Sequence, residues 1–192
     1  MKRTIITKSQ SGFTILEVLI AAVITAVIAA SGFQFYKQMH GQSETQFNVS
    51  EMQQLARSSL YDMRKSLLQA GFKLNGHIPF RIAGDTLAVY YSVTLPIDTI
   101  QYYLVLFTPT EYAAVPDRDP SVPLYKLVKK VNSAAAAIFA DYVTDINFNQ
   151  IDAANVIVTI NVQAMHSDED FATNNGYRNY SISERINIRN VG

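Results

Sequence analysis

The hydrophobic and polar positions divide this chain into three stretches with different periods. Residues 13–36 are almost entirely apolar, and Glu17 is the only side chain among them that is charged at neutral pH. Residues 38–69 contain no proline, and their apolar side chains recur at three- and four-residue spacing. Beyond Gly71 the apolar positions recur every second residue. This pattern predicts one helix of ~55 residues followed by β-strands.

The first stretch is long enough to cross a membrane. A helix needs ~20 residues to span the hydrocarbon core, and this stretch is longer than that. A helix buried in a soluble protein rarely stays apolar on every face. A cleavable secretory signal has a shorter apolar core, and residues 34–38 do not resemble the small-residue cleavage site that follows one. We therefore predict a transmembrane helix over residues 13–36.

The charges beside this helix predict its orientation. Residues 1–12 contain Lys2, Arg3 and Lys8 and no acidic side chain, and little positive charge follows beyond Lys37. Basic flanks stay on the cytoplasmic side of a membrane. We therefore expect the N-terminus in the cytoplasm and the bulk of the chain outside.

The second stretch reads as an amphipathic helix over residues 37–70. Its apolar stripe consists of Met52, Leu55, Ala56, Ser59, Leu60, Met63, Leu67 and Ala70. We interpret this stripe as the side that packs on a globular domain, instead of as a ligand groove. Gly71 is expected to end the helix. Gly32 and Gly41 are expected to bend the helix or melt it locally, because each costs ~1 kcal/mol relative to alanine.

The third stretch predicts antiparallel strands with one face on the helix and one face toward water. The expected strands are residues 86–94, 100–107, 124–131, 143–150, 156–165 and 178–189. Residues 108–123 hold four of the six prolines and are expected to form an exposed loop. Residues 133–140, with four consecutive alanines, are expected to form a short helix or a turn of one. The predicted fold class is therefore α+β, a long N-terminal helix packed on an antiparallel sheet.

Composition excludes several classes of function. The chain has no cysteine, which rules out a disulfide framework, a thiol nucleophile and a cysteine-based zinc or iron–sulfur site. Its 16 basic and 16 acidic side chains balance, and without residues 1–12 the acidic ones are in excess. This balance gives no reason to expect specific binding to nucleic acid. No G-x-S-x-G motif indicates a hydrolase, and we do not expect an enzyme.

The acidic clusters are weak candidates for a metal site. One cluster comprises Asp168, Glu169, Asp170 and Asn174, and a second comprises Asp117, Arg118 and Asp119. Neither has the glycine and the terminal glutamate of an EF-hand loop, so we interpret both as solvated loops. The three histidines lie in unrelated segments and are expected at the surface. We predict no metal and no cofactor, with Asp168 and Asp170 as the weak candidates for calcium.

The sequence around the start of the apolar helix resembles a known processing signal. Residues 8–18 read KSQSGFTILEV, a basic leader followed by Gly, Phe and Glu in register. This arrangement closely resembles the class III signal sequence of type IV prepilins and type II secretion pseudopilins. In that family a membrane prepilin peptidase cuts after the glycine and methylates the new N-terminus. The resemblance implies cleavage between Gly12 and Phe13, which makes Glu17 the fifth residue of the mature chain.

Glu17 is the one acid in the apolar helix, and an acid at mid-membrane costs on the order of 2–3 kcal/mol. It could lie near the interface and reach water. The resemblance instead implies a role in subunit assembly. Our hypothesis is that the Glu17 carboxylate pairs with the N-terminal ammonium of a neighbouring pilin and so sets the axial register of the subunits.

Later segments narrow the resemblance. Residues 60–72, LYDMRKSLLQAGF, look like the helix end of PilW/PulJ-type minor pilins, and residues 84–91 and 186–190 are similar to later segments of that family. The resemblance implies the type IV pilin-like fold. It divides the chain into a cleaved leader (1–12), a transmembrane and filament-core helix (13–36), an amphipathic helix (37–70) and a periplasmic sheet domain (71–192).

Three classes of function follow. The first is a minor pilin that helps to initiate a type IV pilus, at its tip, for adhesion, twitching motility or DNA uptake. The second is a J-type minor pseudopilin of a type II secretion system. In both, the implied partners are other minor and major pilins, the prepilin peptidase, the inner-membrane assembly platform and membrane lipid. The third is a single-pass membrane protein whose outer domain binds a ligand or does chemistry, which requires that the chain stay uncut.

Overall fold

The computed structural model describes residues 12–74, 76–93, 96–115, 122–168 and 171–190. Its longest element is helix α1, which spans Ile15–Gln69 without interruption. Gly32 and Gly41 both lie inside α1, so the helix is not melted at these glycines, whereas a bend at them stays a prediction. Each glycine costs ~1 kcal/mol. Interrupting the helix there would cost more, because a new helical turn would have to be nucleated.

The chain divides into two compact units, Met1–Glu44 and Thr45–Gly192. In the first unit every described residue is exposed, including all the apolar side chains of α1. In the second unit α1 buries one stripe of residues. The buried residues are Met52, Ala56, Ser59, Leu60, Met63, Ser66 and Leu67. The predicted amphipathic stripe is therefore confirmed, except that Leu55 is only partly buried.

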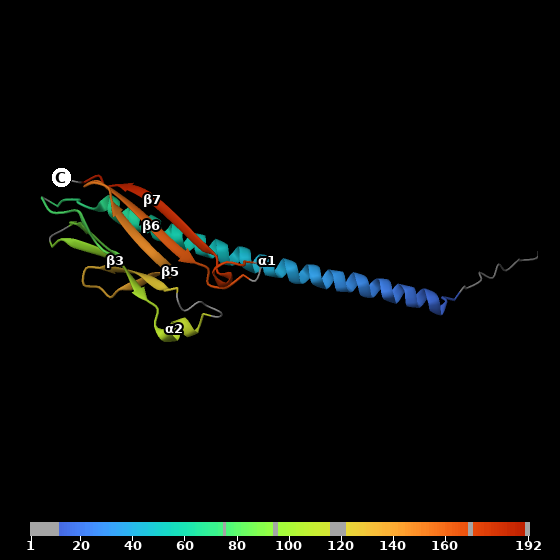
Figure 1. Ribbon diagram of the computed structural model, residues 1–192. Helices are drawn as coiled ribbons and strands as arrows, with labels where there is room; N and C mark the ends of the chain where they lie inside the picture. The colour runs from blue at the N-terminus through green and yellow to red at the C-terminus, as the bar shows by residue number, and fades with distance from the viewer. Residues whose placement is uncertain (1–11, 75, 94–95, 116–121, 169–170, 191–192) are drawn as a thin grey trace, which may run out of the picture. The chain divides into compact units, whose positions relative to one another are not determined.

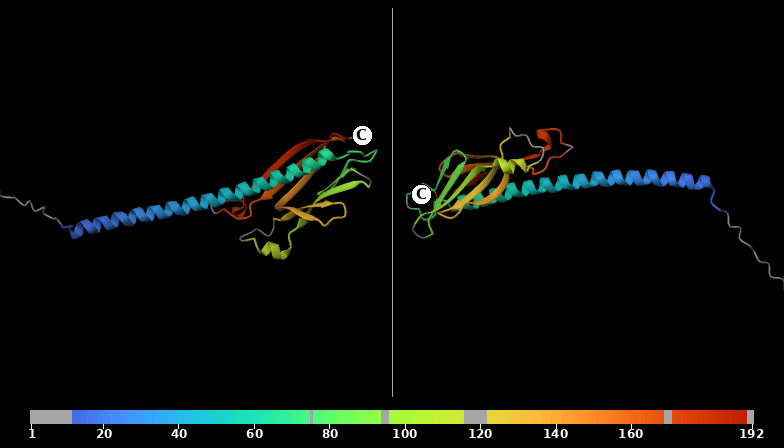
Figure 2. Two further views of the ribbon diagram at one scale, coloured as in Figure 1. Left: turned by 180° about the vertical axis from the view of Figure 1, so that it is seen from behind. Right: turned by 90° about the horizontal axis from the view of Figure 1, so that it is seen from below.

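The described strands of the second unit form one antiparallel sheet, in which each strand pairs with its neighbours in sequence. The strands are β1 (Phe80–Ala83), β2 (Thr86–Tyr91), β3 (Asp98–Leu106), β4 (Tyr125–Val131), β5 (Ala137–Gln150), β6 (Asn155–Gln163) and β7 (Asn179–Asn187). The sheet curls, and the C-terminal part of α1 lies across one of its faces (Figures 1 and 2). The predicted α+β fold, a long helix followed by an antiparallel sheet, is confirmed.

The core of the second unit lies between α1 and the inner face of the sheet. Strand β6 shows the alternation most clearly, since Val156, Val158, Ile160 and Val162 are buried while the residues between them are partly exposed. On α1, Met63 and Leu67 are fully buried in the same cluster. Burying a side chain of this kind stabilises a fold by about 1.5–3 kcal/mol. The second unit therefore owes its stability to apolar contacts between helix and sheet.

Helix α1 ends just before Gly71, as predicted. Gly71 has a φ of +78°, a conformation that glycine adopts without steric cost. Its N–H donates a 2.9 Å hydrogen bond to the carbonyl oxygen of Tyr90 in β2. A Cβ at this position would lie 2.0 Å from the backbone oxygen of Asn190. Glycine is required here because the turn lies against two other segments.

Strand β5 corrects one prediction. Residues 133–140 are neither a short helix nor a helical turn, because Ala137 is already the first residue of β5. The first part of β5 pairs with β4, the second part pairs with β6, and the register shifts on both sides of the change. Tyr142 lies there with a φ of +57°, a left-handed conformation typical of a bulge. Pairing with β4 overrides the helical preference of the alanines.

The described part of the loop between β3 and β4 departs from the prediction. It contains a short helix, α2 (Pro109–Ala113), which was expected as loop. A second apolar cluster of Phe107, Val115, Leu124 and Tyr177 lies beside α2, with Tyr112 and Tyr142 packed against it. The short strand β1 was also not predicted. The loop between β6 and β7 contains the 3-10 turn η1 (Asn174–Gly176).

Candidate functional site at the start of helix α1

The first turn of α1 forms a capping box. Thr14 precedes the helix, and its backbone N–H donates a 2.9 Å hydrogen bond to Oε2 of Glu17. The Thr14 hydroxyl donates to the same carboxylate oxygen at 3.0 Å, and the Glu17 N–H donates to the Thr14 hydroxyl oxygen at 3.2 Å. These bonds satisfy backbone donors that a helix start otherwise leaves without partners. Glu17 therefore holds the helix start as well as carrying a charge.

No cation accompanies this carboxylate within the described part of the chain, where Glu17 forms no ion pair. Its hydrogen-bond donors are both on Thr14 and are neutral. Neutral donors orient a carboxylate but leave its charge uncompensated, which is costly in a medium of low dielectric constant. The arrangement can therefore accept a positive charge from outside the chain. The pairing of Glu17 with the N-terminus of a neighbouring subunit stays a prediction.

Gly12 and Phe13 lie immediately before this capping box. The side chain of Phe13 is 88% exposed, and no atom comes within 4 Å of a Cβ built at Gly12. Helix α1 begins three residues after Gly12, so the bond between Gly12 and Phe13 is in non-helical chain. A peptidase that needs an extended substrate can reach this bond without unwinding the helix. Cleavage and methylation at these residues stay predictions.

The surface of α1 beyond the capping box suits an apolar environment. Its described residues 15–44 are all exposed, and the helix is long and apolar enough to cross a membrane. The hydroxyls of Thr25 and Ser31 donate to the carbonyl oxygens of Ala21 and Val27, at 2.7 and 2.8 Å. Hydroxyls that bond to their own helix need no water. A helix in lipid or in a helix bundle requires this, because no water reaches its polar groups there.

A second polar cluster joins α1 to the sheet in the unit formed by residues 45–192. The Tyr102 hydroxyl donates to Oδ2 of Asp62 at 2.5 Å, and the Lys129 ammonium donates to the same oxygen at 2.7 Å. Ser66 lies 2.8 Å from the Tyr102 hydroxyl oxygen. Burial raises the pKa of Tyr102, and the hydrogen bond to Asp62 raises it further. Tyr102 therefore stays neutral, and the cluster fixes the register of α1 against β3 and β4.

The weak metal candidates are not brought together among the described residues. Asp168 accepts bonds from Nε of Arg178 at 2.8 Å and from a terminal guanidinium nitrogen of Arg178 at 2.7 Å. Asp170, Glu169 and residues 117–119 lie outside the described residues. The described part of the chain contains no group of three or more acidic or histidine side chains able to hold a metal ion. His40, His77 and His166 are all exposed, as expected.

The sequence interpretation missed two features of these sites. The Thr14 cap has a sequence signal, since Thr-x-x-Glu before an apolar run is the pattern of a capping box. The contact of Tyr102 with Asp62 has none, because the two residues are 40 positions apart and meet only in the folded unit.

Comparisons with known proteins identify the N-terminal segment. Residues 7–33 match the family model described as the prokaryotic N-terminal methylation motif. No curated protein matches the chain, and no solved structure does. The motif supports a subunit of the type IV pilin and pseudopilin superfamily, which a prepilin peptidase processes and which assembles with other pilins. Such subunits are structural and typically not enzymes, and a single apolar N-terminal helix fits an anchor in the inner membrane.

Proposed function

We propose that this chain is a minor pilin, a structural subunit that helps to initiate a type IV pilus and stands at its tip. The pilus serves adhesion, twitching motility or DNA uptake. The observation that carries the proposal is the methylation motif at residues 7–33, which extends into helix α1, whose apolar side chains are all exposed as far as residue 44. A resemblance to PilW/PulJ-type minor pilins at residues 60–72 adds support for the minor class.

The proposal assigns a role to each segment. Residues 1–12 are a leader that prepilin peptidase removes on the cytoplasmic side, and residues 13–36 anchor the product in the inner membrane. Residues 37–70 continue the helix into the periplasmic domain, 71–192. The inner-membrane assembly platform then transfers the subunit from lipid to the filament, where helices of other pilins cover the apolar surface.

Glu17 drives this transfer in our proposal. Among the described residues its carboxylate is bonded only to neutral groups of Thr14, and such a charge would stay uncompensated in lipid. Cleavage creates an ammonium group at Phe13, and the ammonium of a neighbouring pilin supplies the missing cation. Pairing two buried charges removes the cost of leaving each alone, which favours the filament over the bilayer and fixes the axial register.

Mass spectrometry of the membrane-extracted protein tests the processing step. Cells with an active prepilin peptidase should yield a chain that begins at N-methyl-Phe13, and cells without the peptidase should yield a chain that still carries residues 1–12. Gly12→Val should block cleavage, whereas Gly41→Ala should not, because Gly41 is far from the cleaved bond. A chain that begins at Met1 in peptidase-active cells would instead support a single-pass membrane protein with another function.

Two substitutions separate the charge of Glu17 from its capping role. Gln keeps the side-chain acceptor of the capping box but has no charge, and Ala removes both. We expect Glu17→Gln and Glu17→Ala to remain in the membrane and both to lose co-purification with partner pilins. Normal co-purification of Glu17→Gln with loss in Glu17→Ala would show that only the cap matters, and charge pairing would be wrong.

The phenotype of a deletion strain distinguishes the pilus from the secretion system. Loss of surface pili with normal release of exoproteins supports the minor pilin. Loss of exoprotein release with normal pili would mean that the chain is a J-type pseudopilin, whose tip complex engages secreted proteins.

A further inference from the structure

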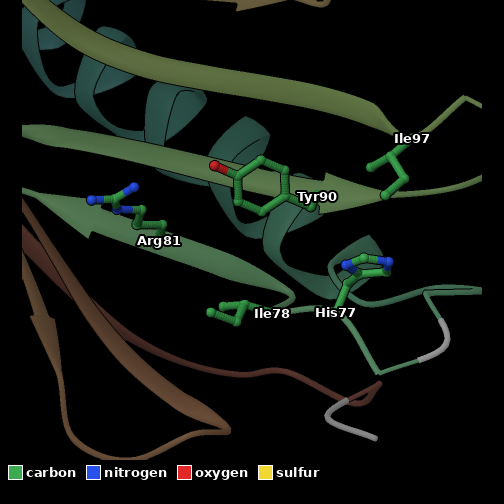
Figure 3. A pocket seen from close by; sticks show the side chains of 5 residues that line it. All are labelled: His77, Ile78, Arg81, Tyr90 and Ile97. Carbon is green, nitrogen blue, oxygen red and sulfur yellow. The ribbon is translucent and has the colours of Figure 1, made fainter.

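A cleft with no assigned role lies on the outer face of the sheet, the face turned away from α1. It is lined by His77 and Ile78 from the segment before β1, Arg81 from β1, Tyr90 from β2 and Ile97 from the segment before β3. Its volume is about 330 Å³. Figure 3 shows these side chains on the near side of the strands, with α1 behind the sheet. The cleft is therefore separate from the helix face that the proposed function uses.

The apolar walls of the cleft are uncovered. The side chain of Ile78 is 72% exposed and that of Ile97 is 37% exposed. The two isoleucines lie beside Tyr90 because side chains alternate between the faces of β2. Leu87 and Val89 point into the core, and Tyr90 points outward. Two exposed isoleucines beside an aromatic ring form an apolar surface that water covers poorly. A ligand that buries them gains free energy.

The guanidinium of Arg81 has no acidic counterpart in the described part of the chain. Neither Arg81 nor His77 forms an ion pair, and the Tyr90 hydroxyl has no hydrogen-bond partner among the described residues. Lys126 and Lys129 of β4, and Arg178 just before β7, by contrast each pair with an acid. A free guanidinium beside aliphatic side chains complements a carboxylate attached to an aliphatic group.

We propose that this cleft binds an acidic aliphatic segment of a partner polypeptide. Arg81 pairs with the carboxylate of an Asp or Glu, and Ile78 and Ile97 pack on the aliphatic side chain next to it. The ring of Tyr90 forms the floor between the charged end and the apolar end of the cleft. The proposal requires neither cleavage of the chain nor Glu17, so it can fail or succeed independently of the pilin assignment.

Size and charge favour a polypeptide over other anions. A volume of about 330 Å³ accommodates a few side chains. Anionic lipid surfaces are recognised by clusters of 4–8 lysines and arginines, roughly, and nucleic acid requires a basic stripe. The cleft has one arginine and one histidine. The single charge of Arg81 suits one carboxylate.

Methyl NMR of the full chain in a non-ionic detergent tests the proposal. The isoleucine methyl groups are labelled with ¹³C, and Ile78→Leu and Ile97→Leu assign the two signals of the cleft. The probe is an acetylated and amidated Gly-Leu-Glu-Leu-Gly peptide, and its control has Gln in place of Glu. We expect the Glu peptide to shift the Ile78 and Ile97 signals. The Gln peptide should have an affinity lower by about tenfold or more, because it lacks the charge-assisted hydrogen bond.

Two arginine variants show whether the affinity for the Glu peptide depends on the guanidinium of the cleft. Arg81→Gln should weaken binding of the Glu peptide about tenfold or more. Arg57→Gln, at an exposed arginine of α1 in the same unit, should leave the affinity unchanged. Unchanged signals of the buried Ile100 and Ile160 methyls establish that both variants are folded.

Several results would overturn the proposal. One is that the Ile78 and Ile97 signals stay in place at millimolar peptide. The others are that the Gln peptide binds as well as the Glu peptide, or that Arg81→Gln binds normally. A response to phosphatidylglycerol but not phosphatidylcholine in lipid nanodiscs, lost in Arg81→Gln and absent with the peptide, would assign the cleft to lipid headgroups instead.

Discussion

The two α-helices among the described residues begin with the same Thr-x-x-Glu pattern, but the surroundings of the two starts are opposite. Thr108 and Glu111 at the start of α2 form the same capping box as Thr14 and Glu17 at the start of α1. The Thr108 N–H and hydroxyl donate to Oε2 of Glu111 at 2.8 and 3.0 Å, against 2.9 and 3.0 Å for Thr14 and Glu17. The local geometry is the same because both segments place a glutamate three residues after a threonine.

The difference lies in what surrounds each cap. The Lys126 ammonium of β4 bonds to Oε1 of Glu111 and compensates its charge. Glu17 has no such cation among the described residues, and the helix behind it has no covering side chains. The unit formed by residues 45–192 thus supplies a cation to the carboxylate of its own cap and buries its own apolar stripe. The start of α1 does neither within the described residues.

The strongest test of this difference removes one apolar side chain from each half of α1. Met63→Ala should lower the free energy of unfolding by about 2–5 kcal/mol, because it leaves a cavity in a core that is fully buried. Val23→Ala, at a position 60% exposed, should change it by less than about 0.5 kcal/mol. Urea unfolding of the full chain in detergent measures both, followed by tyrosine circular dichroism since no tryptophan is present. Equal changes in the free energy of unfolding would mean that the two halves of α1 are packed equally well within the chain.

Introducing a charge tests the surroundings of the exposed half. Ile24→Arg should reduce membrane insertion by about 2.5–3.5 kcal/mol, the cost of arginine at the centre of a spanning helix. Phe47→Arg replaces an apolar side chain that is also exposed, at 69%, but lies in the second unit. It should leave insertion unchanged. Resistance to carbonate extraction measures the fraction in the membrane. Loss of insertion in both variants would extend the membrane segment beyond residue 36.

A smaller effect is expected at the contact between α1 and the sheet. Tyr102→Phe removes the hydroxyl that bonds to Asp62 and Ser66, and should lower the free energy of unfolding by about 1–3 kcal/mol. Tyr103→Phe on the opposite face of β3 should be neutral, since its hydroxyl has no hydrogen-bond partner among the described residues. The same urea titration measures both. A neutral Tyr102→Phe would mean that packing alone fixes the helix.

The smallest effect concerns the cap that has its own cation. The hydrogen bond from Lys126, with further bonds from Thr108, lowers the pKa of Glu111 to about 2. The folded state therefore favours the charged carboxylate. The stabilisation is present above the ordinary pKa of 4.5 and is lost as the pH falls toward about 2.

Hydrogen exchange at Tyr112 and Ala114 from pH 5 to pH 2 measures this loss, corrected for the intrinsic exchange rate. Exchange should accelerate as the pH falls in the natural protein, whereas in Glu111→Gln it should be fast at every pH. Glu184→Gln removes a different carboxylate, which pairs with Arg64 far from α2, and should behave like the natural protein. If Glu184→Gln showed the same fast exchange as Glu111→Gln, the effect would come from the net charge of the protein and not from the cap of α2.

Local patterns predicted the helix and most strands to within a few residues. The buried stripe from Met52 to Leu67 was predictable because residues three and four apart lie on the same face of a helix, whichever element that face packs against. Strand β1 escaped prediction because four residues are too few to show a period. Ala137 was assigned to a helix because alanine favours one, and no local signal reveals its pairing with Lys129 of β4.

The candidate site divides in the same way. Gly12, Phe13 and Glu17 were found from sequence because they are consecutive or one turn apart, and the methylation motif matches the same segment. The cleft residues come from three separate segments, and nothing near Arg81 in the sequence indicates that it lacks an acidic partner.

The amino-acid sequence by itself determined that an apolar helix has one acid near its start and that its later part carries an apolar stripe able to pack on a sheet. These properties depend on neighbours within a few residues. Folding of the whole chain decided the rest. It gave Glu111 a cation from β4, joined Tyr102 to Asp62, and left Arg81 and two isoleucines uncovered on the outer face. These outcomes depend on which distant strands pair, and a strand's pairing energy is spread over both partners, so neither sequence segment contains it alone.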